Sequence, residues 1–279
     1  MARMRFTDDP TSRLAIWARR FAFFSLVATL LSIIVVRSGF LEIEPSIATF
    51  GGALVFAGLA ILLGLAAFIT IWKDGLSGLG HALMAIAIGG LLLLYPAYLG
   101  VKAYKLPAIS DITTDPIDPP RFEAIARVRP RNANPIIYAG LYAAEQQRIA
   151  YPNIEPLLLT VTPKIAFDAA LTIANKRRWR VVDTRDPAPG RPEGRIEAVA
   201  RTPVMGFRDD IVIRVRPAPD GSRIDVRSAS RYGRHDFGTN AARIRSLLDD
   251  IDDIAVPPAE KPEKKPPPGK NQKAQGPKR

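Results

Sequence analysis

The residues best suited to chemistry lie close together in residues 223–245, in the run RIDVRSASRYGRHDFGTNAARIR. The planar guanidinium group of an arginine donates two parallel hydrogen bonds to a phosphate or carboxylate, so a cluster of arginines can bind an anion. The same arginines can instead pair with carboxylates of the chain in a structural network. Both alternatives use the same candidate residues: Asp209, Asp210, Arg214, Arg227, Ser228, Ser230, Arg231, Asp236, Asn240, Arg243 and Arg245.

Groups with the spacing of a catalytic site are few. Asp209 and Asp210 are neighbours, so in a strand their side chains point to opposite faces and cannot form an acid–base pair. Ser228 and Ser230 have no evident partner base, because His235 follows only after a turn. The chain contains no cysteine and only two histidines, which excludes thiolate chemistry and disfavours a zinc site. We predict no catalytic residue, metal or cofactor, and keep a membrane-tethered hydrolase acting on an envelope substrate as the alternative.

A helix predicted over residues 240–254 has its charges in unfavourable places. Arg243 and Arg245 fall in its first turns and four aspartates in its last turns, which is opposite to the arrangement that the helix dipole favours. Two hypotheses explain how such a helix is stable. Either the arginines pair with aspartates among the candidate residues, or they join the helix N-terminus and the preceding glycine turn in holding an anion.

The elements that position these residues follow from hydrophobic periodicity. Alternating apolar residues between turns rich in Pro and Gly predict strands, and apolar residues at helical spacing predict helices. Short turns cannot connect parallel strands, so the sheet should be antiparallel. We predict an α+β domain over residues 105–256, in which an antiparallel β-sheet has two helices on one face. The predicted strands are 157–162, 179–184, 195–202, 210–216 and 223–230, and the predicted helices are 165–178 and 240–254.

Alternation along these strands assigns the two faces of the sheet. Ile211, Ile213 and Val215 should face the helices. We expect the opposite face to be exposed and strongly basic, and the proline-rich segment before the domain to be an extended lead-in. The residues assigned to the basic face are Arg195, Glu197, Arg201, Arg214, Arg216, Arg223, Asp225 and Arg227.

Three apolar segments precede the domain, at about residues 21–41, 46–72 and 82–101. Each is long enough to cross a hydrocarbon core of about 30 Å. None carries an ionisable residue at its centre, so an ion or proton pathway has no candidate. We predict a transmembrane anchor of three spans within residues 1–104. Small residues of the second span should pack against a neighbouring span, and these are Ala53, Ala57, Ala60 and Gly64.

Basic residues near the first span predict its orientation. Five arginines precede the span, namely Arg3, Arg5, Arg13, Arg19 and Arg20, whereas the loop that follows it contains a single arginine. We expect a multi-pass protein of the inner membrane with its N-terminus in the cytoplasm. Three spans then place the C-terminal domain on the opposite side, which is the periplasm in a Gram-negative cell.

The formal net charge of +12 is densest at the C-terminal end of the sequence. Residues 257–279 are rich in Pro and Lys, which predicts a disordered basic tail. No aromatic platform accompanies the charge, so nucleic acid is not an expected partner. The expected partners are the lipid bilayer and, for the basic surfaces, anionic lipid head groups or envelope polymers.

Two segments, GRIEAVARTPVMGFRDDIVIRVRP and RIDVRSASRYGRHDFGTNAARIRSLL, resemble the domain of unknown function 1499 family. Members of that family share the patterns GF-x-DD and RS-x-SR-x-G-x-x-D-x-G-x-NAARI. The resemblance covers residues 111–254 and implies domain limits but no activity. From the residues themselves, we expect a membrane-anchored extracytoplasmic binding or envelope-support module with an arginine-rich anion-binding surface.

Overall fold

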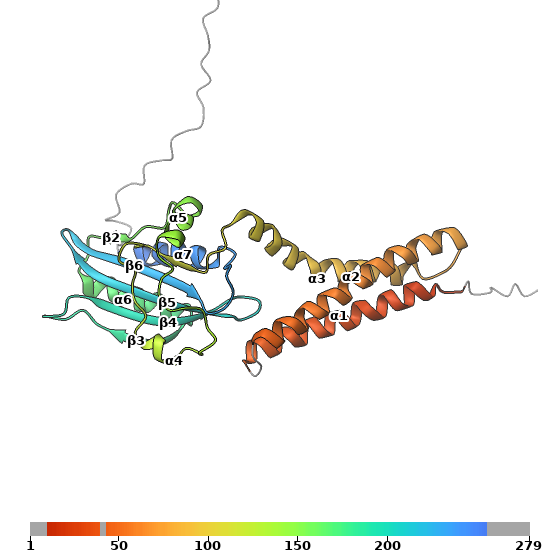
Figure 1. The fold of residues 1–279 in the computed structure, drawn as a ribbon, viewed down its shortest axis with the longest axis horizontal. Helices are drawn as coiled ribbons and strands as arrows, with labels where there is room; N and C mark the ends of the chain where they lie inside the picture. Colours follow the sequence, from red (N-terminus) through yellow and green to blue (C-terminus); the bar gives the residue numbers. More distant parts are fainter. Residues whose placement is uncertain (1–9, 40–42, 256–279) are drawn as a thin grey trace, which may run out of the picture.

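Three long helices precede a folded domain in the computed structural model, which describes residues 10–39 and 43–255 (Figure 1). The helices are α1 (Arg13–Ser38), α2 (Ile43–Asp74) and α3 (Leu79–Lys105). Each is long and apolar enough to cross a membrane. The prediction of three long apolar N-terminal helices is therefore confirmed. The basic tail predicted at 257–279, together with Arg3 and Arg5, lies outside the described residues.

Small residues bring the three helices together. Ala57, Ala60 and the other predicted packing residues of α2 lie inside the bundle, and Gly64 lies in close contact with α3. A Cβ atom added at Gly89 of α3 would lie 2.6 Å from Cγ1 of Ile61, so these two helix backbones approach too closely for any larger residue. Large side chains such as Leu91 point outward. This arrangement suits a lipid bilayer. Lipid chains are as apolar as leucine, so burying large apolar side chains between the helices gives no hydrophobic stabilisation there.

The domain follows α3 and is built on one antiparallel sheet. Its strands lie in the order β1-β6-β5-β4-β3, and β2 pairs with β6 beside β1. The predicted antiparallel α+β architecture is confirmed. The elements of the domain are β1 (Asp111–Thr113), α4 (Ala124–Val128), α5 (Leu141–Ala150), β2 (Leu157–Leu159), α6 (Pro163–Lys176), β3 (Arg180–Arg185), β4 (Gly194–Arg201), β5 (Arg208–Ala218), β6 (Gly221–Ser230) and α7 (Thr239–Ala255).

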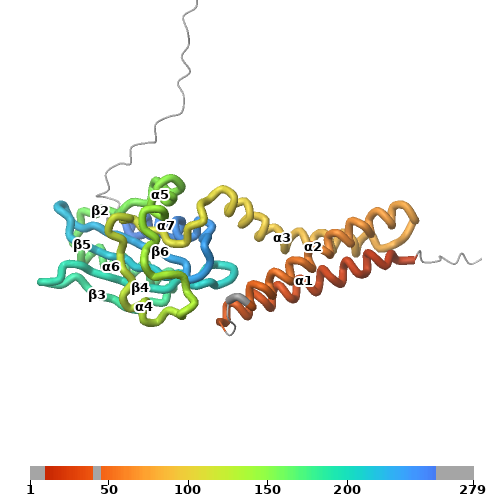
Figure 2. Tube along the Cα trace, viewed as in Figure 1, coloured from red at the N-terminus to blue at the C-terminus, as the bar shows by residue number. Residues whose placement is uncertain are grey.

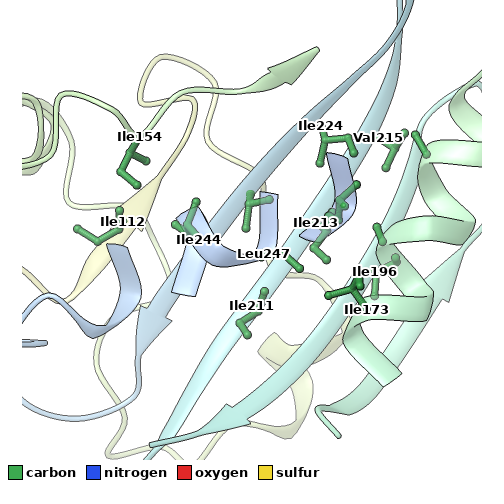
Figure 3. Close-up of a cluster of buried hydrophobic side chains, with 14 of the residues drawn as sticks. Ile112, Ile154, Ile173, Ile196, Ile211, Ile213, Val215, Ile224, Ile244 and Leu247 are labelled. Carbon is green, nitrogen blue, oxygen red and sulfur yellow. The ribbon is translucent and has the colours of Figure 1, made fainter. Parts of the chain in front are cut away.

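The main core lies between the sheet and the helices α6 and α7. Ile211 and Ile213 of β5 meet Ile173 of α6 and Ile244 and Leu247 of α7 in this layer (Figure 3). All five side chains are almost fully buried. Helices α6 and α7 cover the face of the sheet that alternation assigned to them. The assignment holds because every second side chain of a strand points to the same side of the sheet.

The opposite face of the sheet is also covered, so its predicted exposure is wrong. The segment between α3 and α5 runs over this face, from the β6 side towards β3 (Figure 2). Phe122 and Ile125 of this segment pack against Val199, Val212 and Ala229. Four of the charged residues assigned to the exposed face are buried instead, and they are Glu197, Arg214, Asp225 and Arg227. The sequence missed β1 and α4 because both are short and lie in a proline-rich stretch.

Candidate functional site

Two loops of the domain lie against the ends of the apolar helices: residues 202–207 between β4 and β5, and residues 231–238 between β6 and α7. Arg37, near the end of α1, donates from Nη1 to the backbone carbonyl oxygens of Pro203 (2.6 Å) and Val204 (3.0 Å). Arg201 donates in return to the carbonyl oxygen of Arg37 (3.2 Å). We call this contact region between loops and helices the seam.

Glycine is required in each loop at the seam. Gly206 has φ +72°, and an added Cβ would lie 3.0 Å from Cγ of Arg37. Gly238 has φ +76°, and an added Cβ would lie 3.0 Å from Cδ1 of Leu106, directly after α3. Only glycine adopts this conformation without strain and leaves room for the neighbouring chain. Both glycines of the sequence motifs therefore allow the domain to approach the apolar helices.

His235 is fixed at the same seam by both of its ring nitrogens. Its Nε2 lies 3.1 Å from the carbonyl oxygen of Leu106, and the amide of Phe237 lies 2.9 Å from its Nδ1. A carbonyl accepts and an amide donates, so Nε2 donates to Leu106 and Nδ1 accepts from Phe237. The ring also stacks on Phe237. His235 thus ties the second loop to the end of α3.

A pocket of about 330 Å³ lies in the seam. Its wall on the helix side is formed by Ile47 of α2 and by Tyr95 and Leu99 of α3. The domain side contributes apolar side chains from both loops and a set of charged and polar groups. These domain residues include Met205, Phe207, Phe237, Arg208, Asp209, Arg234, His235 and Asp236. The pocket is therefore largely apolar with charged groups at one side.

Arg243 has an internal partner for its charge. It forms an ion pair with the buried carboxylate of Asp209, and it also donates to the Ser228 hydroxyl (2.9 Å) and to the Asn240 side-chain oxygen. Ser228 donates to the same Asn240 oxygen at 2.8 Å, and the Asn240 amide donates to Ser230 at 3.0 Å. For Arg243 the observed contacts agree with the first hypothesis, in which the arginine pairs with an aspartate of the chain. The ion pair offsets the unfavourable position of a cation in the first turns of α7.

Asp236 provides the N-terminal cap of α7. Its carboxylate accepts hydrogen bonds from the backbone amides of Gly238 and Asn240, each at 2.9 Å. These amides have no partner inside the helix, and a carboxylate here also interacts favourably with the helix dipole. Burial nevertheless raises the pKa of Asp236, because desolvation of the charged form outweighs the two hydrogen bonds.

Asp210 is shared by two arginines on the covered face of the sheet. Arg231 approaches one carboxylate oxygen to 2.7 Å, and Nε of Arg129 lies 3.1 Å from the other. Asp210 is fully buried, and this burial raises its pKa despite both cations. One carboxylate thus faces two guanidinium groups, which leaves an excess of positive charge at this point.

The arginines at the far end of the same face are paired by carboxylates. Asp225 accepts from Arg214 (3.1 Å), Arg216 (2.8 Å) and Arg223 (2.8 Å), and Asp115 and Asp118 of the covering segment complete this network. A larger anion-binding surface at this end is therefore not supported by the geometry.

Arg227 and Arg245 differ in how their charge is compensated. Arg227 pairs with Asp111 at 2.6 Å and lies over the ring of Phe122. Arg245 lies over the ring of Tyr151, and within residues 10–39 and 43–255 it forms no ion pair. Arg243 and Arg245, which were predicted to act together at the start of α7, therefore differ: Arg243 pairs with a carboxylate and Arg245 lies over an aromatic ring.

A serine hydrolase would require a serine next to a base. Ser228 and Ser230 contact Asn240, and Ser228 also contacts Arg243, whereas both nitrogens of His235 bind backbone groups. Among the described residues no Ser–His pair is formed. In that same part of the chain, no three His, Cys, Asp or Glu side chains gather in a way that could hold a metal ion.

Sequence reasoning missed several residues at the seam. Arg37, Tyr95 and Leu99 belong to segments that were assigned to the membrane anchor, and Arg208 lies at a strand end outside the predicted strand. The positive charge of Arg37 directly after an apolar run was the available signal, because it was the single arginine in that loop.

The comparisons with known proteins identify a family for the domain. A family model described as "Protein of unknown function (DUF1499)" matches residues 111–251. No curated protein and no solved structure matches the chain. The match begins at β1 and contains both sequence motifs, so it confirms the resemblance that these motifs predicted. The chain therefore belongs to the DUF1499 family of proteins of unknown function.

Proposed function

We propose that the protein is a multi-pass protein of the inner membrane whose periplasmic domain binds an amphiphile of the cell envelope at the membrane surface. It acts as a binding or envelope-support module and not as an enzyme. The observation that carries this proposal is the seam pocket, because its wall is formed jointly by α2, α3 and the two motif loops.

The composition of the pocket supports an amphiphile over a purely polar ligand. Ligand sites of proteins commonly have volumes of about 300–1,000 Å³ and are mostly apolar with a few polar groups. Met205, Phe207 and Phe237 offer surface for a hydrocarbon chain, and Arg208 adds a cation. An anionic lipid combines both kinds of group in one molecule.

Access from the bilayer supports a lipid source for the ligand. Ile47 and Tyr95 line the pocket, and their side chains are exposed by 48% and 40%. In a membrane, exposed side chains of the spanning helices face lipid chains. A lipid chain reaches the pocket from the side without leaving the bilayer surface.

The orientation rests on the distribution of basic residues. Arg13, Arg19 and Arg20 lie at the start of α1, and three helices place the domain on the side opposite to this end. A reporter enzyme that is active only outside the cytoplasm, fused after Arg279, tests the orientation. Activity of the fusion is expected, and an inactive fusion with an active fusion before Met1 would refute it.

Lipid retention tests the binding function directly. Leu99→Trp fills part of the pocket, whereas Leu91→Trp makes the same change on an outward-facing position of the same helix. The full chain is purified in mild detergent and its bound lipids are counted by mass spectrometry. We expect retained lipid in the natural protein and in Leu91→Trp, and about tenfold less in Leu99→Trp, which corresponds to about 1.4 kcal/mol. Equal retention in both variants, or no retained lipid in the natural protein, would refute the proposal.

A further inference from the structure

A second, smaller pocket of about 90 Å³ lies on the covered face of the sheet, close to the seam. Four arginines line it, and they come from the strands β3, β4 and β5 and from the end of β6: Arg180, Arg201, Arg208 and Arg231. The remaining lining side chains are the valines Val128, Val182 and Val199. We call this site the arginine pocket.

Strand register forces two of these arginines together. Arg201 of β4 and Arg208 of β5 are direct cross-strand partners. Like charges in opposite positions of neighbouring strands destabilise a sheet, unless a charge of the other sign lies between them. Arg180 joins them from β3, where it is the partner of Val199. The register therefore concentrates positive charge in one place.

The chain supplies too few carboxylates to neutralise this charge. Within residues 10–39 and 43–255, Arg180, Arg201 and Arg208 form no ion pair with a carboxylate. Asp210 lies on this face, opposite Val199, but it is already shared by Arg231 and Arg129.

Arg129 adds a further positive charge beside the pocket, although it does not line the pocket itself. Its side chain is only 6% exposed and follows Val128, a lining residue of the pocket. Its Nε lies 3.1 Å from Asp210, yet none of its three nitrogens makes a hydrogen bond. A buried guanidinium group without hydrogen bonds is costly, so an anion nearby would stabilise it.

We propose that the arginine pocket binds a phosphate group. Guanidinium forks match phosphate oxygens, and the small volume suits one phosphate better than a polymer segment. Arg208 lines both this pocket and the seam pocket. This assignment rests on the proposed binding of an amphiphile. The phosphate belongs to the head group of that ligand, and the apolar part of the ligand lies in the seam pocket.

Phosphate-dependent stabilisation of the full chain tests this site. The protein is placed in micelles of a maltoside detergent, which contains no phosphate, and Tm is followed by tryptophan fluorescence with and without inorganic phosphate. A second arm adds phosphatidic acid to the micelles and no inorganic phosphate. A ligand present at about ten times its Kd should raise Tm by about 3 to 6 °C. A rise only in the second arm identifies a lipid head group, and a rise with inorganic phosphate identifies a soluble source.

The variants decide whether the arginine pocket causes the rise. Arg180→Gln combined with Arg208→Gln should abolish it, and the single change at the exposed Arg180 should weaken it without affecting folding. Arg191→Gln removes the same charge from an exposed turn at the other end of β4 and should keep the full rise. Because the double change relieves repulsion, its Tm without phosphate should not fall below that of the natural protein.

The results also separate the two proposals. No rise in either arm, or a rise that persists in the double variant, overturns the arginine pocket. If the Leu99→Trp variant loses lipid while phosphate has no effect, the amphiphile proposal stands and the phosphate proposal fails. If phosphate stabilises the protein while lipid retention is unaffected by Leu99→Trp, the phosphate site stands and the proposed binding of an amphiphile in the seam pocket fails.

Discussion

Glu197 holds the covering segment on the sheet through one buried carboxylate. It accepts hydrogen bonds from the backbone amides of Glu123 (2.8 Å), Ala124 (3.1 Å) and Ile125 (2.8 Å), at the start of α4. The first amides of a helix have no partner inside the helix, so this carboxylate satisfies them from another strand. Glu197→Gln keeps the size of the side chain and one accepting oxygen, but it turns an NH₂ group towards at least one of these amides.

The cost of this change follows from the lost hydrogen bonds. Hydrogen bonds to a charged group contribute about 1.5–3 kcal/mol each, and a buried donor left without a partner costs about 1–3 kcal/mol. Two amides share one oxygen of Glu197, so glutamine can still serve these two and loses the third. We expect the free energy of unfolding to fall by about 3 kcal/mol, which lowers Tm by roughly 6 to 12 °C for a domain of this size.

Thermal unfolding and amide hydrogen exchange of the full chain measure the effect. The amides of residues 123–125 should exchange much faster in Glu197→Gln, because the opening of α4 becomes easier. Glu193→Gln is the matched control on the same strand hairpin, where the carboxylate pairs with Arg195 near the surface. This control should cost less than about 1 kcal/mol. Unchanged protection of residues 123–125, or equal losses of Tm in both variants, would refute the reasoning.

Two further predictions concern the buried carboxylates. Arg243→Ala leaves Asp209 buried without its cation and should lower the free energy of unfolding by about 3–5 kcal/mol. Adding Asp209→Asn should recover part of this loss in a urea-unfolding double-mutant cycle, and strictly additive losses would contradict the ion pair. Burial raises the pKa of Asp210 above its ordinary 3.8, so the folded protein binds this proton more tightly than the unfolded chain. The stability contributed by Asp210 is thus greatest below 3.8 and is lost as pH rises through the raised pKa. Asp210→Asn should remove this slope from Tm against pH, and an identical slope in both proteins would argue against it.

The sequence by itself determined the elements that depend on local pattern. Long uncharged runs predicted three apolar helices, and period-two alternation between turns with Pro and Gly predicted the antiparallel strands. The helices predicted at 165–178 and 240–254 correspond to α6 and α7 for the same reason. Each of these features depends on neighbours within a few residues, so one stretch of sequence contains the whole signal.

The candidate site could be predicted only as a set of residues. Asp209, Asp236, Asn240 and Arg243 were identified, and the structure brings them together between β5 and α7. Their roles were not predictable, because an arginine has the same attraction for a carboxylate of the chain and for an external anion. Arg208 was not selected, since its significance lies in its register with Arg201.

Only the tertiary structure decided which charges are available to a ligand. Arg214 meets Asp118, a partner 96 positions earlier, and Glu197 meets amides more than 70 positions earlier. These contacts form because the segment before α5 folds back over the sheet and buries a face that alternation alone marks as polar. Alternation records which side chains share a face and contains no information about what covers that face. The covering chain neutralises the arginines at one end of the sheet, and it leaves the positive charge near the seam uncompensated among the described residues.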